Sequence, residues 1–355
     1  MDYSSDRNFG CRIFEFKHRG LSCLSMENEL IKVVITADRG ADIIELTYKP
    51  RDVDFMWKAP GGIRPAGKHI PTSANSFGNY VDYLHGGWQE ILPGGGPFVY
   101  KGAEIGLHGE VCLIPWHYKI VNDSSDYISV EFWCQTVRFP FTLVKRIGIK
   151  QGSAVLEIEE KLTNNSEEDL EFLWAQHPTY GKPFLDGKCK IDIAAEEFST
   201  SNFYNSPTAL FKPEHKGTWP FDTTVYNEKI DLSIIPPHSK PVSDLYYIEG
   251  LKEGWYAITN MNQELGIGLV WDLETYPYLT YWQVCNGSAG YPWYSRTYNI
   301  GLELWNCYTD KYTTAKANGT LKTIRGHETI GTTMKAVIYC GRKNVNSISP
   351  DGDVE

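Results

Sequence analysis

Three polar side chains stand in sequence contexts that favour catalysis. His108 lies between glycines in "GLHGE", where the missing side chains let another molecule approach the imidazole. His177 ends the apolar segment "FLWAQHPTYG", and Pro178 stops strand pairing beyond it. Glu303 lies in "YNIGLELWN". A carboxyl group and two imidazoles in one cleft would serve as general base and general acid near neutral pH.

The neighbours of Glu303 predict that it is buried. They are apolar: Ile300, Leu302, Leu304 and Trp305. A strand of this kind is expected to be covered on both faces, and burial raises the pKa of a carboxyl group toward that of a base working near neutrality. The alternative is a structural ion pair between Glu303 and Arg296 or Arg146.

The histidines also have a structural alternative, because both could cap turns at strand ends. An aromatic cluster around glycines precedes Glu303 in the chain. It consists of Trp282, Tyr291, Trp293 and Tyr294. Such a cluster is either core or the stacking wall of a sugar pocket, and its place between a histidine and a carboxylate candidate favours the wall.

Short segments with alternating apolar and polar residues recur along the chain and must position these side chains. They lie at 30–38, 41–49, 127–137, 141–150, 154–164, 189–198, 255–261, 265–272 and 321–339. Turn residues separate them, and helical periodicity is almost absent. The pattern predicts an all-β protein with a large antiparallel β-sandwich, organised as a single domain over residues 1–355.

Two regions interrupt the strand rhythm, at 57–98 and 200–240. They are long and rich in glycine, proline and aromatic residues, which favours functional loops over disorder. We expect the first region to line or cover a site. The segment "ILPGGGP" within it is not followed by Lys-Ser/Thr or by a helix, which favours a tight turn over a phosphate cradle.

The composition limits the kinds of partner and ligand that we expect the protein to bind. The chain has 34 Lys+Arg against 44 Asp+Glu, a net charge of -10 and no basic stripe, which disfavours nucleic acid and membrane surfaces. The eight cysteines lie far apart without metal-ligand spacing, so reduced thiols are expected and no metal site. With no signal-like segment, the expected location is the cytoplasm. Aromatic residues make up 14% of the chain, a hint of a carbohydrate ligand. The oligomeric state is left open.

Three motifs in order resemble the aldose 1-epimerase (galactose mutarotase-like) family. They are "HG" followed by Pro115-Trp116, "HP" after "LTNNS" at a strand end, and Gly-Leu-Glu-x-Trp near the C-terminus. The similarity runs from about residue 30 to about residue 340. It implies a twisted β-sandwich with a sugar across a cleft on one face.

The resemblance also implies roles for individual residues. Glu303 would be the base, His177 the acid and His108 the group that holds the ring oxygen, with no cofactor. The reaction implied is interconversion of the α and β anomers of a free sugar. Further candidates for sugar binding are His85, Gln89, Glu90, Arg146, Asp272, Trp282 and Trp293.

The sequence departs from the family pattern at several positions, and there the assignment of residues to roles has alternatives. His85 in "LHGGWQEILPGGG" competes with His108 for the first-histidine position, although the downstream Pro-Trp favours His108. Asp272 is a stand-in for a sugar-binding aspartate. Relatives that act on hexose 6-phosphates carry an arginine at a position that falls here around Val111 and Cys112, with Glu110 beside them. A carboxylate there would repel a phosphate, so an unphosphorylated sugar is expected.

Other functions compete with the epimerase. A glycoside hydrolase would pair Glu303 with Glu90 or Glu110. A non-catalytic sugar-binding protein on the same fold would bind sugar without accelerating anomer exchange.

Overall fold

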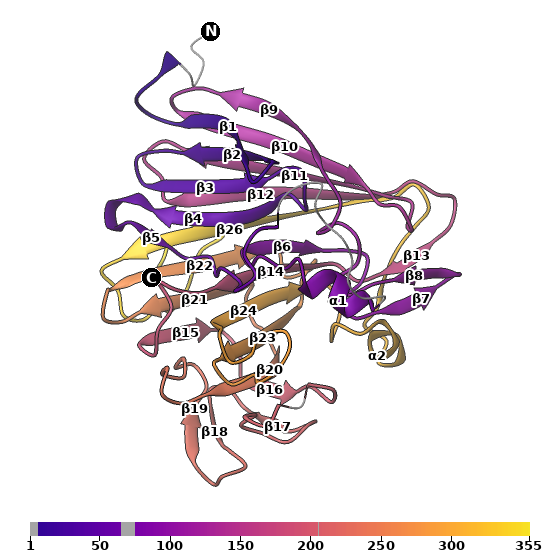
Figure 1. Cartoon of the computed structure of the whole chain (residues 1–355), viewed down its shortest axis with the longest axis vertical. Coiled ribbons are helices and arrows are strands. Elements are labelled where there is room, and N and C mark those ends of the chain that lie inside the picture. The colour runs from indigo at the N-terminus through magenta and orange to yellow at the C-terminus, as the bar shows by residue number, and fades with distance from the viewer. Residues whose placement is uncertain (1–5, 65–74, 205) are drawn as a thin grey trace.

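A large antiparallel sheet dominates the computed structural model, which describes residues 6–64, 75–204 and 206–355 (Figure 1). Within these residues the sheet has twelve strands. In spatial order they are β1 (Arg12–His18), β2 (Leu21–Glu27), β3 (Ile31–Thr36), β4 (Asp42–Tyr48), β6 (Trp88–Ile91), β14 (Ala175–Tyr180), β24 (Tyr298–Trp305), β23 (Tyr278–Cys285), β20 (Val242–Glu249), β16 (Glu197–Thr200) and β17 (Lys216–Thr218), with β5 (Val53–Asp54) beside β4.

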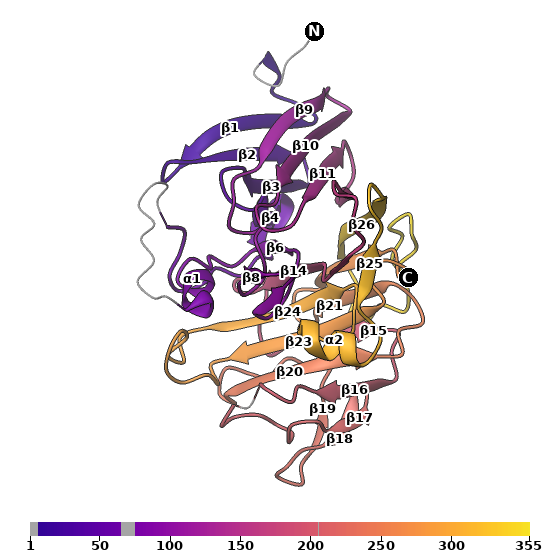
Figure 2. The same cartoon turned by 90° about the vertical axis from the view of Figure 1, so that its right-hand side faces the viewer.

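A second antiparallel sheet packs against the first, as the two views show (Figures 1 and 2). Its order is β15 (Cys189–Ile193), β21 (Trp255–Asn260), β22 (Leu265–Trp271), β26 (Thr329–Cys340), β12 (Val155–Asn164), β11 (Phe141–Lys150), β10 (Tyr127–Gln135) and β9 (His117–Asp123). The predicted all-β sandwich is therefore confirmed.

The small elements lie outside these sheets. Three two-stranded sheets are β7 (Phe98–Tyr100) with β8 (Ala103–Ile105), β13 (Leu170–Phe172) with β25 (Lys322–Ile324), and β18 (Phe221–Thr223) with β19 (Lys229–Asp231). The helices of the described residues are short: α1 (Ser76–Val81), α2 (Tyr312–Ala317) and the 3-10 turn η2 (Lys49–Arg51). None of these described helices has the length and apolar character needed to cross a membrane.

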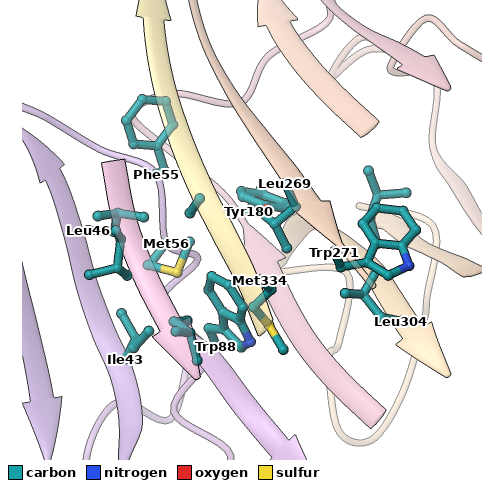
Figure 3. Close-up of a cluster of buried hydrophobic side chains, with 14 of the residues drawn as sticks. Ile43, Leu46, Phe55, Met56, Trp88, Tyr180, Leu269, Trp271, Leu304 and Met334 are labelled. Carbon is teal, nitrogen blue, oxygen red and sulfur yellow. The ribbon is translucent and has the colours of Figure 1, made fainter. Parts of the chain in front are cut away.

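The core lies between the two sheets (Figure 3). Leu46 on β4 and Trp88 on β6 come from the first sheet, while Leu269 on β22 and Met334 on β26 come from the second. All four are at most 2% exposed. The period-two pattern of the sequence produces this core because alternate side chains of a strand point to the same face.

One charged group is buried in this core. The Lys145 ammonium on β11 lies 2.6 Å from a Glu90 oxygen on β6 and 3.5 Å from a Glu160 oxygen on β12. Lys145 therefore joins the second sheet to the first. It also shows which face of the first sheet is inward, because Glu90 must point toward the second sheet.

The cysteines behave as small core side chains. Seven of the eight are buried, Cys340 is exposed, and none forms a disulfide. This agrees with the expectation of reduced thiols.

Candidate active site

A cavity of about 170 Å³ opens on the first sheet and is lined by five of the ten predicted site residues. His108, His177 and Glu303 all line it, as do the predicted wall residues Trp282 and Trp293. The cavity lies on the outer face of the sheet: Gln89 and His177 alternate along their strands with Glu90 and Gln176, which point into the core.

Strand register brings the acid and base candidates together. The pairing of Ala175 with Trp305 and of Thr179 with Gly301 sets His177 on β14 opposite Glu303 on β24. Directly opposed residues of an antiparallel pair project from the same face. The His177 Nε2 atom lies 3.2 Å from Glu303 Oε1.

The same cross-strand row continues on both sides. Gln89 on β6 is opposite His177, and Thr280 on β23 is opposite Glu303. Beyond Thr280, Tyr247 on β20 and then Ser199 on β16 complete the row. Neighbouring strands are roughly 4.8 Å apart, so the row is a ladder of polar groups at that spacing.

Burial shifts both members of the pair away from their charged forms. The pKa of Glu303 is raised to about 8, mainly by burial and further by the charge of Asp310. A hydrogen bond from Trp305 Nε1 to Glu303 Oε2, at 3.1 Å, opposes this shift. Burial also lowers the pKa of His177 to about 4. Between these values the pair carries one proton.

His108 reaches the cavity from a strained turn. Its backbone has φ +61°, and its N–H donates to the Gly95 carbonyl at 2.6 Å. The ring centroids of His108 and His177 are 5.1 Å apart. Burial lowers the pKa of His108 well below its usual range, and its Nδ1 has no hydrogen-bond partner. The imidazole is therefore neutral and can hydrogen-bond a ligand.

Gly109, which follows His108, is needed for backbone packing and not, as expected, for the approach of another molecule to the imidazole. A Cβ at Gly109 would lie 2.2 Å from the Leu92 carbonyl oxygen, and the residue has φ +74°. The glycine therefore lets two backbone segments meet, and ligand access does not explain it. The run from Gly94 to Gly96 is likewise a turn against the chain, since Gly96 N–H donates to the Asp310 carbonyl at 2.7 Å.

A buried hydrogen-bonded chain supports His108 from behind. The Tyr80 ring packs on His108 with centroids 4.4 Å apart, and its hydroxyl donates to Gln89 Oε1 at 2.5 Å. Gln89 Nε2 then donates to Asp42 Oδ2 at 2.8 Å, and His85 Nε2 lies 3.2 Å from that same oxygen. His85 thus belongs to the support and does not line this cavity, so His108 occupies the cavity position.

Tryptophan rings form one side of the cavity, and Tyr291 and Tyr294 of the predicted aromatic cluster are not among its lining residues. Trp282 and Trp293 lie 6.0 Å apart by ring centroids, and Trp57 packs on both. A Cβ at Gly301 would lie 3.3 Å from the Trp282 ring and 3.3 Å from Glu303 Oε1. The glycine therefore gives the carboxylate and the indole their room.

Several lining residues were not expected from the sequence. Asp310 shares the cavity with Glu303, accepts a hydrogen bond from the Tyr247 hydroxyl at 3.2 Å, and has a pKa raised by burial. Tyr80 on α1 was not expected either. Their positions have no sequence signal, but Trp305 stands two residues after Glu303 and could have been placed on the same face of the strand.

Some predicted site residues lie elsewhere. Arg146 follows Lys145 on β11, points away from the core and donates to Glu131 at 2.8 Å. Asp272 accepts from Glu274 N–H and the Thr275 hydroxyl and so closes a turn.

Two carboxylates are also structural in this fold. Glu90 lies between the sheets with Lys145. Glu110 is 5% exposed and accepts backbone N–H bonds from Val137 and Arg138, so it does not face a ligand. The argument against a phosphate that was based on Glu110 is therefore wrong.

Glu303 does not form the ion pair that was its structural alternative. Arg146 pairs with Glu131, and the Arg296 guanidinium lies over the Tyr294 ring. Within residues 6–64, 75–204 and 206–355, no three His, Cys, Asp or Glu side chains are arranged to hold a metal ion.

Comparison with known proteins places the chain in a family and a fold. A family model described as a domain of unknown function, DUF4432, matches residues 18–232. This span includes His108 and His177 but not Glu303. The sequence has no match among the curated proteins.

Solved structures share the architecture at low identity. A protein from Klebsiella pneumoniae named as a candidate aldose 1-epimerase has a TM-score of 0.69 and 14% identity, over 93% of this chain and 87% of its own. A galactose mutarotase-like protein from Clostridium acetobutylicum has a TM-score of 0.64 and 14% identity, over 94% and 99%. A galactose mutarotase related enzyme from Lactobacillus acidophilus has a TM-score of 0.59 and 16% identity, over 89% and 97%. The chain therefore belongs to the family described as a domain of unknown function, DUF4432, and has the galactose mutarotase-like β-sandwich fold.

Proposed function

We propose that the protein is a cofactor-independent aldose 1-epimerase that interconverts the α and β anomers of a free sugar. The observation that carries the proposal is the contact of 3.2 Å between His177 Nε2 and Glu303 Oε1 at the floor of a cavity walled by tryptophans. The similar structures support the fold of such an enzyme, and the proposed activity is argued from the site itself.

The reaction needs one proton acceptor and one proton donor on the same sugar. The acceptor removes the proton of the C1 hydroxyl while the donor protonates the ring oxygen, and the bond between C1 and that oxygen breaks. The open aldehyde turns about its C1–C2 bond and the ring closes by the reverse transfers. No proton is gained or lost over the cycle, so a pair that carries one proton is sufficient.

The position of the shared proton before sugar binds decides whether Glu303 or His177 can act as the base. Burial places the shared proton on Glu303 in the empty cavity, because its pKa is about 8 and that of His177 about 4. For Glu303 to act as base, the proton must cross to His177 when sugar enters. Sugar hydroxyls that donate to the carboxylate favour its charged form and drive that transfer.

The remaining lining residues have roles consistent with this proposal. His108 is neutral and its ring lies beside His177, so it can polarise the ring oxygen without being the proton donor. The indoles of Trp282 and Trp293 offer apolar faces to the C–H bonds of a sugar ring. Thr280 lies opposite Glu303 in the strand register and lines the same cavity.

The competing glycoside hydrolase hypothesis paired Glu303 with Glu90 or Glu110, and neither of these two partners is available at the cavity. Glu90 is paired with Lys145 in the core, and Glu110 holds backbone N–H groups. Asp310 is the second carboxyl group at the cavity among the described lining residues. Release of aglycone from aryl glycosides, lost in Asp310→Asn, would establish hydrolysis in place of epimerisation.

The direct test is exchange NMR of α and β anomers on a panel of free aldoses. We expect acceleration by the wild type, and a fall of about 10²-fold or more in Glu303→Gln and in His177→Asn, because each removes one partner of the proton transfer. Glu303→Gln should stay folded, since glutamine replaces a carboxyl group that is already neutral at pH 7. Thermal unfolding checks this.

A comparison of His108→Asn with His85→Asn tests the proposed supporting role of His108. His108→Asn should lower the exchange rate more than His85→Asn, because His85 contacts the cavity only through Asp42, Gln89 and Tyr80. Saturable sugar binding without faster exchange would reject the epimerase and establish a binding protein.

A further inference from the structure

A second cavity of about 270 Å³ lies beside the first on the same sheet. It is lined by Ser199 and Tyr247, which belong to the polar row that contains His177 and Glu303. Along this row Tyr247 lies two strands from Glu303, roughly 10 Å away at the usual strand spacing. That distance is about the length of a disaccharide.

The two cavities share their walls. Asp310 lines the first cavity, while Thr309 and Lys311 on either side of it line the second. Tyr204 lines the first, and the preceding Phe203 lines the second. The partition is completed by the Tyr247 hydroxyl, which lines the second cavity and donates to Asp310 Oδ1 at 3.2 Å.

The lining of the second cavity mixes hydroxyl groups, both signs of charge and an aromatic ring. The hydroxyl groups of Ser199 and Tyr308 share a hydrogen bond of 2.7 Å. Lys216 and Glu214 form no ion pair with any described residue, although both line the cavity. Their hydrogen-bonding capacity is therefore free for a ligand.

Phe203 contributes an exposed apolar surface at this place. Its side chain is 39% exposed, and the Lys311 ammonium lies 3.5 Å from its ring centroid. An aromatic face with donors and acceptors around it suits a sugar ring, because each hydroxyl group both donates and accepts while the C–H bonds pack on the aromatic surface. A phosphate would be met by the Glu214 carboxylate as well as by the lysines, so the lining favours a neutral ring.

We propose that the second cavity is a glycosyl subsite, so that the substrate is a reducing disaccharide or a longer chain. This rests on the proposed function for its orientation. Ring opening requires a free anomeric carbon at His177 and Glu303, so the reducing ring occupies the first cavity. The second ring, attached at another carbon of the reducing ring, crosses the partition formed by Tyr247 and Asp310.

The test compares cellobiose, gentiobiose and melibiose with glucose and galactose. We expect the wild type to favour at least one disaccharide in kcat/KM for anomer exchange. Phe203→Ala should lower the ratio of disaccharide to monosaccharide kcat/KM by about fivefold or more, because it removes one stacking surface. Thr314→Arg, which introduces a long side chain into the second cavity, should lower the same ratio.

The matched control is Phe16→Ala. Phe16 is 40% exposed, like Phe203, and lines a different depression of the same sheet. This variant should leave both the ratio and the absolute rates at their wild-type values. Equal kcat/KM for monosaccharides and disaccharides in the wild type, or an unchanged ratio in Phe203→Ala and Thr314→Arg, would overturn the subsite.

Binding separates this proposal from the proposed function. In the Glu303→Gln background, calorimetry should show tighter binding of the preferred disaccharide than of glucose, and Phe203→Ala should weaken it about fivefold. Such binding without any exchange in the wild type would reject the epimerase and keep the subsite. Binding of glucuronate but of no disaccharide would reject the glycosyl subsite, and a chain that binds none of these sugars would reject both proposals.

Discussion

At the scale of single residues, the site depends on what burial does to two titratable groups. Glu303 is 6% exposed and His177 is 4% exposed, and water is replaced around both by indole rings and strands. Desolvation moves the two pKa values in opposite directions, because one group is charged when it loses a proton and the other when it gains one. The result is a pair that holds one proton over a wide pH range.

A pH profile should report this pair. Below about pH 4, His177 and Glu303 both carry a proton and no base remains; above about pH 8, both have lost it and no acid remains. After subtraction of the spontaneous reaction, kcat/KM for anomer exchange should be bell-shaped with limbs near these values. Glu303→Gln should lose the high-pH limb from its residual activity. A single limb near pH 6.5, the usual value for histidine, would contradict the coupled pair.

At the scale of elements, strand register and one turn position the three proposed catalytic side chains. β14 and β24 set His177 opposite Glu303, whereas His108 arrives on a turn without regular structure. That turn is held by the close approach of Gly109 to the Leu92 carbonyl and by the bond from His108 N–H to Gly95. The position of His108 therefore depends on the link between Gly109 and Leu92 and on the hydrogen bond to Gly95.

Gly109→Ala tests that link. A Cβ there would lie 2.2 Å from the Leu92 oxygen, so the turn must shift and carry His108 with it. We expect a loss of stability of about 2 kcal/mol or more and a slower anomer exchange. Gly102→Ala is the control: Gly102 also has a positive φ, +90°, but nothing lies within 4 Å of its added Cβ. Equal losses in urea unfolding for the two variants would show that the close approach is unimportant.

At the scale of the whole molecule, the two sheets are joined by an apolar core and by one buried ionic cluster. Lys145 of the second sheet contacts Glu90 of the first, which is the strand neighbour of Gln89 in the support of His108. The pKa of Glu160 is raised well above its usual range, first by burial and then by the charge of Glu90. The cluster therefore depends on the lysine.

Lys145→Met should destabilise the protein by about 3 to 5 kcal/mol in urea unfolding at neutral pH, because it leaves buried carboxylates without their cation. The loss should shrink as the pH falls, since protonation of Glu160, whose pKa burial raises, removes a buried negative charge. The control is Lys161→Met, on the strand that carries Glu160, where a side chain 59% exposed should contribute less than about 0.5 kcal/mol. A Lys145→Met variant as stable as the control would show that the cluster does not hold the sheets together.

The sequence predicted the fold better than it predicted the site. Alternation at 127–137, 141–150 and 154–164 corresponds to β10, β11 and β12, because a strand with one buried face records its period in its own residues. The similar solved structures share this fold. No comparable local signal existed for Tyr80 or Asp310, whose place in the cavity depends on how distant segments pack.

Residue types and strand periodicity therefore determined an all-β sandwich with buried Glu303, and they singled out His108 and His177. Only the tertiary structure decided which polar residues meet. Adjacent positions on one strand point to opposite faces, so Gln89 faces the cavity and Glu90 the core, and Lys145 is buried while Arg146 points away from the core. Strand pairing, which joins positions more than a hundred residues apart, placed His177 against Glu303, and a list of residue types does not contain that pairing.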